Sequence, residues 1–274
     1  MTTVRRLLAP SPASLVSLLT APADATTSCL PDGLRRAVCE RLGGGGHDVV
    51  LRLDAFAVER GPARFGEPFR WTVRASRRTL GTAALRHLED RVATDPLRAA
   101  TEAIEALCDR AHRGLARRGT LGTWLATQPA AVRAACAVAA ATWATAVAHV
   151  VDLDLHHDVV AVGVPDAWVE VPGARTTLHG RADAVGRAEG RGVLRVRDGA
   201  PGPRALDGLA VDGLLASLVA GGADRPARIL GAWPDAGLCV VVELDAETLR
   251  RGARALVRAA PSPKPVVVSP PLAA

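Results

Sequence analysis

The chain has 274 residues, of which 49% are hydrophobic, so it can bury one large core or two small ones. Arginine supplies almost all of the 34 basic residues, since Lys264 is the single lysine, and the formal net charge is +6. This arginine- and alanine-rich composition is typical of GC-rich bacterial genomes, for example actinobacterial ones. Because that bias raises arginine everywhere, the charge permits nucleic-acid binding but does not by itself indicate it.

The cysteines and the apolar segments exclude several classes of protein. The five cysteines contain no CxxC pair, which argues against a disulfide framework or a zinc site and favours reduced thiols in a cytoplasm. Pro10, Pro12 and Pro22 interrupt the apolar N-terminal stretch, so no secretory signal is expected. The most apolar run, residues 134–148, is too short to span a bilayer. We therefore expect a soluble cytoplasmic protein without a membrane partner.

In the first half of the chain the patterns predict mainly helices. Ser11 before Pro12 is typical of a helix start and predicts a short helix over 12–19, and a second helix over 32–42 should end at the glycine run 43–46. Alternating apolar residues predict a strand over 47–60, followed by a Pro/Gly-rich loop over 61–70. Apolar residues at three- and four-residue steps predict long helices over 96–117 and 130–151, the second of them central and buried.

From residue 158 onward the period becomes that of strands. We expect strands over 158–164, 175–185, 192–197, 227–233 and 238–244, with a helix at about 205–220 after the third. Asp245 suits the N-cap of a last helix over 246–259, and the Pro-rich tail 261–274 should be extended or disordered. Together these elements predict one α/β domain over residues 1–260. It would have a central mixed β-sheet flanked by helices, with a helical part at about 80–152 and a sheet core at about 158–258.

Several common catalytic motifs are missing from the sequence. The glycine run before His47 is not followed by the Gly-Lys-Ser/Thr of a P-loop, and Gly-x-Ser-x-Gly does not occur. The glycines of residues 186–192 do not have the spacing of a dinucleotide-binding turn. These observations argue against a P-loop nucleotidase, an α/β-hydrolase and a Rossmann oxidoreductase.

Residues 179–201 carry the most informative pattern. A strand with Asp183 is followed by a Gly-rich turn and by a second strand that contains Arg195 and Arg197 and ends before Asp198. This layout resembles the active-site hairpin of RecB-type nucleases of the PD-(D/E)XK superfamily. The resemblance implies a restriction-endonuclease-like core in which an acid on the first strand and an acid-x-Lys triplet on the second hold Mg²⁺. Here Arg195 and Arg197 replace that acid and that lysine, and guanidinium groups cannot ligate a metal.

Weaker likenesses lie elsewhere in the chain. Residues 11–22 are similar to the family's Ser-Pro-rich first helix, but Ala21 replaces its cysteine, so the resemblance implies no iron–sulfur cluster. Gly81 and Thr82 match a Gly-Thr-x-x-His segment that begins a helix, with Leu85 in place of the histidine and His87 two residues further on.

Three further positions also depart from the family pattern. Gly163 stands where the resemblance places a glutamate. Gly208 and Asp212 stand where it places a Gln-x-x-x-Tyr pair. Almost every functional position is thus changed, while the apolar frame around these positions persists.

The resemblance leads to three hypotheses. In the first, the protein is a catalytically degenerate RecB-like nuclease domain without a cofactor, a DNA-binding or structural subunit in DNA repair, defence or mobile-element processing. Its partners would be DNA and a helicase or another repair subunit, and Arg195, Arg197 and Arg181 would contact a phosphate or an acidic group of the partner. In the second, it is an active Mg²⁺-dependent DNase whose ligands are Asp183 and Asp198.

Other residues and other interpretations bear on these hypotheses. Glu170 or His87 would assist the metal ligands of the relocated site. In the third hypothesis the protein is a protein-interaction module that never touches DNA. For the residues themselves, Asp183 can instead pair with Arg181, Arg195 or Arg197, and Arg195 and Arg197 can simply be exposed strand residues.

Overall fold

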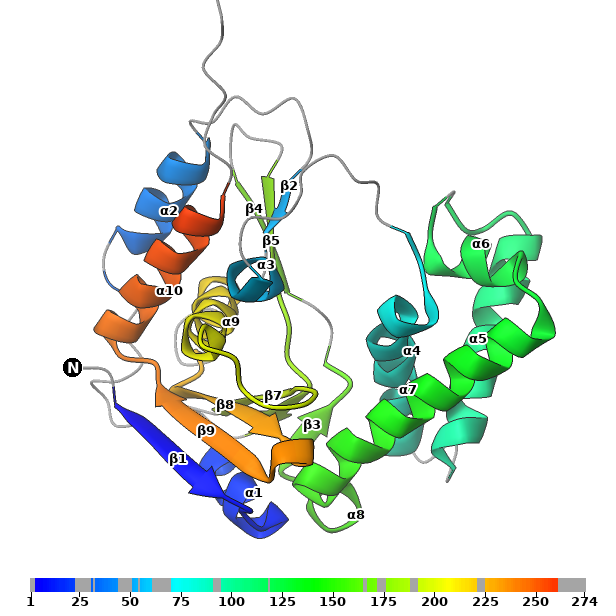
Figure 1. Ribbon diagram of the computed structural model, residues 1–274, viewed down its shortest axis with the longest axis horizontal. Coiled ribbons are helices and arrows are strands. Elements are labelled where there is room, and N and C mark those ends of the chain that lie inside the picture. Colours follow the sequence, from blue (N-terminus) through cyan, green and yellow to red (C-terminus); the bar gives the residue numbers. More distant parts are fainter. Residues whose placement is uncertain are drawn as a thin grey trace, which may run out of the picture.

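The computed structural model describes residues 3–22, 31, 33–43, 51–53, 55–60, 70–90, 95–117, 119–164, 167–171, 176–187, 192–220 and 225–260. Within these ranges the protein is α/β, with a six-stranded mixed sheet flanked by helices (Figure 1). The strand order of this sheet is β1-β9-β8-β7-β6-β3. Only the β7–β8 pair is parallel among these neighbours, and the other pairs are antiparallel. A smaller sheet has the order β2-β5-β4.

The strands have the following bounds: β1 Val4–Leu8, β2 Leu51–Leu53, β3 Val160–Val162, β4 Ala167–Glu170, β5 Thr176–Gly180, β6 Ala184–Gly186, β7 Gly192–Val196, β8 Arg228–Trp233 and β9 Leu238–Glu243. The first helices are α1 Pro12–Thr20, α2 Leu34–Gly43, α3 Ala55–Arg60, α4 Val73–Glu89 and α5 Pro96–His112. They are followed by α6 Leu121–Ala126, α7 Ala130–Val151, α8 Leu153–His156, α9 Ala205–Val219 and α10 Ala246–Ala259. A short 3₁₀ turn, η2 Pro234–Ala236, joins β8 to β9.

The large sheet is a central layer that is buried on both faces. Successive strand residues point to opposite faces: Val193 and Ile229 belong to a core with α9 and α10, whereas Leu194 and Leu230 belong to a core with α1 and α7. Figure 1 shows α9 and α10 on one side of the sheet and α1 on the other. Strands buried on both faces read as continuous apolar runs, as in residues 238–242 of β9.

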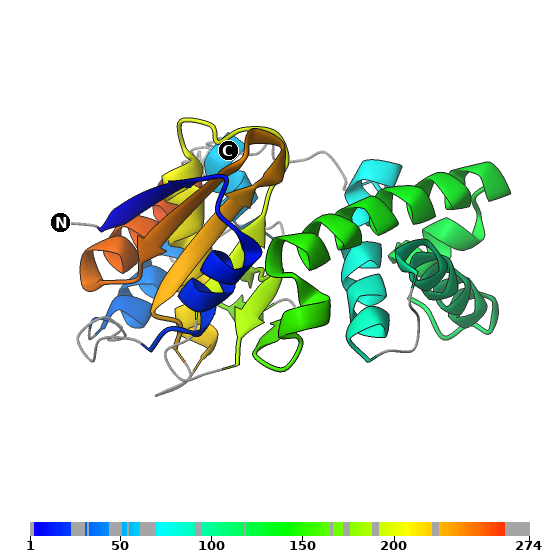
Figure 2. The same cartoon turned by 90° about the horizontal axis from the view of Figure 1, so that it is seen from below.

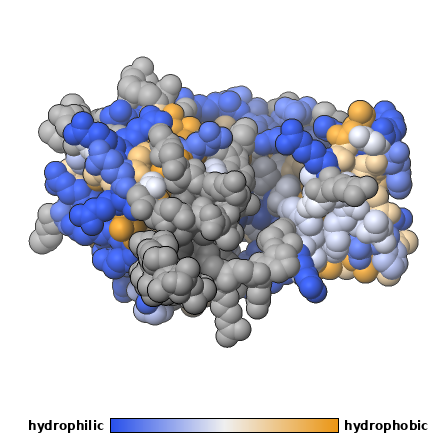
Figure 3. All heavy atoms as spheres, turned by 90° about the horizontal axis from the view of Figure 1, so that it is seen from above, coloured by the Kyte–Doolittle hydropathy of each residue, from blue (hydrophilic) through white to orange (hydrophobic). Residues whose placement is uncertain are grey.

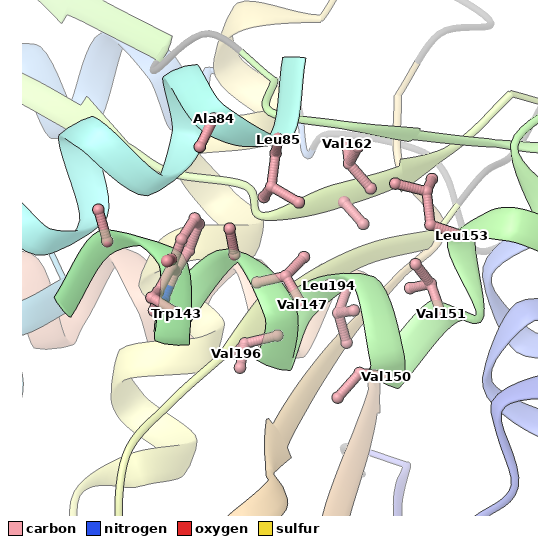
Figure 4. Close-up of a cluster of buried hydrophobic side chains, with 14 of the residues drawn as sticks. Ala84, Leu85, Trp143, Val147, Val150, Val151, Leu153, Val162, Leu194 and Val196 are labelled. Atoms are coloured by element: carbon pink, nitrogen blue, oxygen red, sulfur yellow. The ribbon is translucent and has the colours of Figure 1, made fainter. Parts of the chain in front are cut away.

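Helix α7 joins the sheet to the helical part of the protein. Trp143, Val147 and Val150 pack in one core with Leu194 and with residues of α4 (Figure 4). The other end of α7 lies among α4 and α5, which extend away from the sheet (Figure 2). By length and composition alone, this helix is long and apolar enough to cross a membrane, and half of its most apolar window is buried inside the protein. The apolar segment is thus longer than the run 134–148 on which the sequence-based expectation of a segment too short for a bilayer was based.

The segment 175–185, expected to be one strand, divides between the two sheets. Its first part, β5, pairs with β4 and β2 in the small sheet, and its last part, β6, pairs with β7 and β3 in the large one. The period of two persists through the segment, but Gly180 and the irregular residues after it let the chain change sheets. Strand β4, which was not expected, forms because Val169 pairs with Leu178 in the small sheet and both side chains are buried.

Four further differences concern local propensity. The expected strand over 47–60 is β2 followed by helix α3, in which Ala55 and Val58 share a buried face three residues apart. Helix α4 begins at Val73, so Gly81 lies inside it and does not begin it. The helix from residue 96 ends at His112, and α6 follows it. Strand β1 was not expected, because Arg5 and Arg6 interrupt the alternation of apolar and polar residues that is typical of a strand. The strand forms nevertheless, because it pairs with β9.

The helix starts at Ser11 and Asp245 are confirmed, since each side chain accepts a hydrogen bond from the backbone N–H three residues later. The expected loop over 61–69, the end of the glycine run at 44–46 and the tail 261–274 lie outside the described residues. On the face of the molecule in Figure 3, hydrophilic residues dominate the described surface at the end where α2 and α10 lie. Hydrophobic and hydrophilic residues alternate there over the helical end.

Candidate functional site

Asp183 lies directly before β6, and its fully buried side chain is surrounded by positive charge. Arg78 of α4 donates from Nε to Asp183 Oδ1 at 2.9 Å. Arg195 of β7 donates from Nη1 to Asp183 Oδ2 at 2.7 Å, and the backbone N–H of Val196 donates to the same oxygen at 2.8 Å. Both carboxylate oxygens of Asp183 are therefore occupied by donors of this chain.

Arg195 and Arg197 lie two residues apart at the end of β7, so both side chains leave the sheet on the face that α9 covers. Asp212 of α9 accepts at Oδ2 from Arg195 Nε at 2.9 Å and from Arg197 Nη2 at 3.2 Å. Arg197 also donates from Nη1 to Glu59 of α3. The two arginine side chains are only 10% and 12% exposed.

Six side chains thus alternate in charge along one continuous series, which we name the ion-pair chain: Arg78, Asp183, Arg195, Asp212, Arg197 and Glu59. Its three guanidinium groups and three carboxyl groups balance when all are ionised. Two indole rings back its cations, with Arg78 5.9 Å from the ring centroid of Trp143 and Arg197 5.8 Å from that of Trp233. The ion-pair chain connects α4, the β6–β7 hairpin, α9 and α3.

Gly208 and Asp212 lie one turn apart on α9, and each has a part in this arrangement. A Cβ added to Gly208 would overlap the carboxylate of Glu59, with the Glu59 Cδ 2.6 Å away. The bare helix position therefore provides the space in which Glu59 reaches Arg197. Asp212 supplies the negative charge between the two arginines. The charge of Asp212 thus matches the charges of Arg195 and Arg197, and the missing side chain of Gly208 leaves room for the acid that pairs with Arg197.

Asp183 and Glu59 differ in how firmly they are ionised. Burial alone raises the pKa of Asp183, but the charges of Arg195 and Arg78, with the Val196 N–H bond, outweigh burial and hold that pKa below its ordinary value. For Glu59 burial is the dominant cause and raises the pKa, and Arg197 offsets only part of this rise. Glu59 is the more weakly held carboxylate of the two.

The ion-pair chain does not satisfy all of its polar atoms. Among the described residues, Asp212 Oδ1 and Arg197 Nε are buried without a hydrogen-bond partner. An unsatisfied buried group typically costs about 1–3 kcal/mol. The ion-pair chain therefore has one acceptor, Asp212 Oδ1, and one donor, Arg197 Nε, that its own hydrogen bonds do not use.

Other positions singled out by the resemblance serve packing. Leu85 is fully buried in the core shared by α4 and α7 (Figure 4). Gly163 follows β3 with φ +62°, and a Cβ there would lie 2.9 Å from the carbonyl oxygen of Thr82 and 2.7 Å from Arg86 Cγ. No acidic side chain could be accommodated at residue 163 without moving α4.

The remaining candidate residues lie in other surroundings. Asp198 accepts two hydrogen bonds from Arg77 Nη2, at 2.7 and 2.6 Å, and is 53% exposed. Glu170 belongs to β4 of the small sheet, and His87 Nδ1 lies 3.9 Å from a Glu102 carboxylate oxygen. Arg181 donates from Nε to a ring nitrogen of His179 at 3.3 Å.

The donor set around Asp183 does not suit the Mg²⁺ that the resemblance implies. Mg²⁺ requires near-octahedral coordination by oxygen, whereas the groups nearest the Asp183 carboxylate are the guanidinium groups of Arg78 and Arg195 and a backbone N–H. Within the part of the chain that the structure describes, no group of three or more His, Cys, Asp or Glu side chains is placed to hold a metal ion. We therefore derive no metal-dependent step at this site.

Sequence reasoning missed two members of the ion-pair chain, Arg78 and Glu59. Arg78 is 105 residues from Asp183, and Glu59 is 138 residues from Arg197, so no local spacing connects them. Glu59 also fell within a segment expected to be a strand. Comparisons of the chain with protein-family models, with curated proteins and with solved structures find no match to any of them.

Proposed function

We propose that the protein is a catalytically degenerate RecB-like nuclease-fold domain of the PD-(D/E)XK type that acts as a DNA-binding or structural subunit. One observation carries this proposal. Four of the positions aligned by the resemblance, Asp183, Arg195, Arg197 and Asp212, form a balanced ion-pair chain together with Arg78 and Glu59, with Arg195 and Arg197 where an acid and a lysine would lie. A site built from guanidinium–carboxylate pairs cannot bind a catalytic metal ion, but the pairs still hold the hairpin and α9 together.

The order of the elements supports the same proposal. Helix α7 is followed by β3, by the β6–β7 hairpin, by the crossover helix α9 and by β8, which runs parallel to β7. The sequence pattern predicted this order of helix, strand, hairpin, helix and strand, although β4 was not expected and the segment 175–185 is divided into β5 and β6. Asp183 lies directly before β6, and its backbone N–H donates to Leu194 of β7, so the hairpin brings Asp183 beside Arg195.

The balance of charge shapes the role that we assign to the arginines. Arg195 is paired with two acids and is nearly buried, so it acts as an internal cation that connects the hairpin to α9. Arg197 lies at the end of the ion-pair chain beside Glu59, the most exposed of the three acids. On this proposal, Arg197 contacts a phosphate of DNA. The protein would act in DNA repair, defence or mobile-element processing, together with a helicase-type partner.

A nuclease assay tests the loss of catalysis. Linear duplex and single-stranded DNA are incubated with the protein in Mg²⁺ or Mn²⁺, beside a folded Asp183→Asn variant as the control. We expect no cleavage by either protein. Cleavage by the wild type that is absent in Asp183→Asn would overturn the proposal and favour an active DNase.

Gel-shift titration over a range of salt concentrations tests DNA binding. We expect binding at low salt whose logarithmic affinity falls linearly with the logarithm of the salt concentration, because phosphate contacts release counterions. Failure to bind any DNA at low salt would instead favour a module that contacts only proteins.

A further inference from the structure

The outer end of the ion-pair chain has the features of an occupied anion site. The Glu59 carboxylate contacts Arg197 Nη1 and lies directly over the bare Cα of Gly208. The Trp233 ring backs the Arg197 guanidinium at 5.8 Å. Figure 1 shows the short helix α3, which carries Glu59, beside α9. A cation and a helix position without a side chain thus adjoin one carboxylate, and an aromatic ring backs the cation.

Burial distinguishes Glu59 from the other two acids of the chain. The side chains of Asp183 and Asp212 are 0% and 1% exposed and each pairs with two arginines, whereas Glu59 is 25% exposed and, among the described residues, its ion pair is with Arg197. Burial without full compensation raises the pKa of Glu59. Glu59 is therefore the acid that can leave at least cost.

Charge balance defines what could replace it. With Glu59 withdrawn, three guanidinium groups would face two carboxylates, and one positive charge would remain at Arg197. Guanidinium binds carboxylate and phosphate oxygens in the same planar geometry. A phosphodiester carries one negative charge, as the Glu59 carboxylate does, so it would restore the balance, whereas a dianion would exceed it.

We propose that Glu59 is an internal substitute for a phosphodiester, and that a phosphate of a nucleic-acid backbone binds Arg197 over Gly208 when Glu59 is withdrawn. The choice of nucleic acid as the source rests on the proposed function. The site itself rests on Arg197, Gly208 and Glu59 alone. The contact between α3 and α9 then keeps this anion site closed until a stronger anion competes with Glu59.

Dimethyl phosphate is the probe for the site, because it is a phosphodiester without a base or a second phosphate. Thermal unfolding is measured against its concentration at constant ionic strength for the wild type, Glu59→Ala and Glu59→Ala with Gly208→Ala. The added methyl group at residue 208 fills the space over α9 and leaves Arg197 unchanged. It is therefore the matched control for binding by charge alone.

We expect the melting temperature of Glu59→Ala to rise by about 3–5 °C at ten times the dissociation constant. The wild type and the double variant should change by less than about 1 °C under the same conditions. No response in Glu59→Ala, or an equal response in the double variant, would overturn the proposal. If Glu59→Ala does not fold, Glu59→Ser, which also empties the space over Gly208, replaces it, with the same expected rise and the same refuting outcome.

DNA binding by the same variants separates this proposal from the proposed function. We expect Glu59→Ala to bind a short DNA at least about tenfold more tightly than the wild type at low salt, and the double variant to lose this gain. Binding of dimethyl phosphate without any binding of DNA would sustain the anion site and refute the DNA-binding function. Wild-type DNA binding that Glu59→Ala leaves unchanged, with no response to dimethyl phosphate, would do the reverse.

Discussion

Replacing Asp183 with alanine tests whether the ion-pair chain holds the fold together. The substitution leaves Arg78 and Arg195, whose side chains are 18% and 10% exposed, without their shared carboxylate. Removing one partner of a buried ion pair typically costs about 3–5 kcal/mol, because the other charge stays buried without compensation. For a chain of this size, such a loss lowers the melting temperature by roughly 6–20 °C.

Asp198→Ala is the matched control, because it also removes an aspartate from an arginine pair near the end of β7. Asp198 is 53% exposed and its partner Arg77 is 29% exposed, so solvent screens the pair and its loss should cost about 0–1 kcal/mol. The measurement is urea unfolding of the wild type and both variants, with equal m-values confirming that the denatured states are comparable.

A double-mutant cycle adds a direct measure of the pair. If Asp183 and Arg195 are coupled, Asp183→Ala with Arg195→Met should cost less than the sum of the single variants, by about 0.5–3 kcal/mol. An Asp183→Ala variant no less stable than Asp198→Ala, or strictly additive effects in the cycle, would refute the reasoning.

The remaining predictions concern pH and backbone conformation. Because the pKa of Asp183 is lowered on folding, its contribution to stability is complete above the ordinary aspartate pKa of about 3.9 and is lost as the pH falls through the lower native value. The difference in the free energy of unfolding between wild type and Asp183→Asn should therefore shrink below about pH 4, and a constant difference would contradict this sign. Gly163→Ala should cost about 2–5 kcal/mol, from its positive φ of +62° and from overlap with Thr82 and Arg86. The control, Gly199→Ala, has a similar φ of +66° but nothing within 4 Å of the added Cβ, so it should cost only about 1–2 kcal/mol in urea unfolding. Equal costs for the two glycines would show that packing at residue 163 is loose.

The long helices could be predicted because their signals are local. The helix over 130–151 and the helix over 246–259 are confirmed with those bounds, since apolar spacing along the first and the N-cap of the second are contained in neighbouring residues. The strand cores at 160–162, 192–196, 228–233 and 238–243 are confirmed for the same reason. Hydrophobic periodicity and helix capping depend on residues only a few positions apart, so a single sequence is enough to recognise them.

Sheet membership and ion pairing could not be predicted in the same way. A strand-like period over 175–185 is the same whether the segment lies in one sheet or in two, and the change at Gly180 depends on the partners β4 and β7. The partners of Asp183 and Arg197 come from α4 and α3, more than 100 residues away. Their choice is a tertiary property. The sequence could show that Arg195 and Arg197 are unable to ligate metal, and it offered Asp183 as a partner of Arg195, which is confirmed, but it did not indicate Asp212 or Glu59 as their other acids.

On the proposed function, this neutralisation explains how a nuclease-like frame could persist without its metal. Acids that converge on one point repel each other unless a cation lies between them. In the enzymes that the sequence resembles, a divalent ion would supply that charge, whereas here the guanidinium groups of Arg195 and Arg197 supply two positive charges that belong to the protein itself. Each substitution then makes another tolerable, since Asp212 lies between the two arginines and Gly208 makes room for Glu59. Replacing Arg195 with an acid would therefore leave two guanidinium groups against four carboxylates in the ion-pair chain.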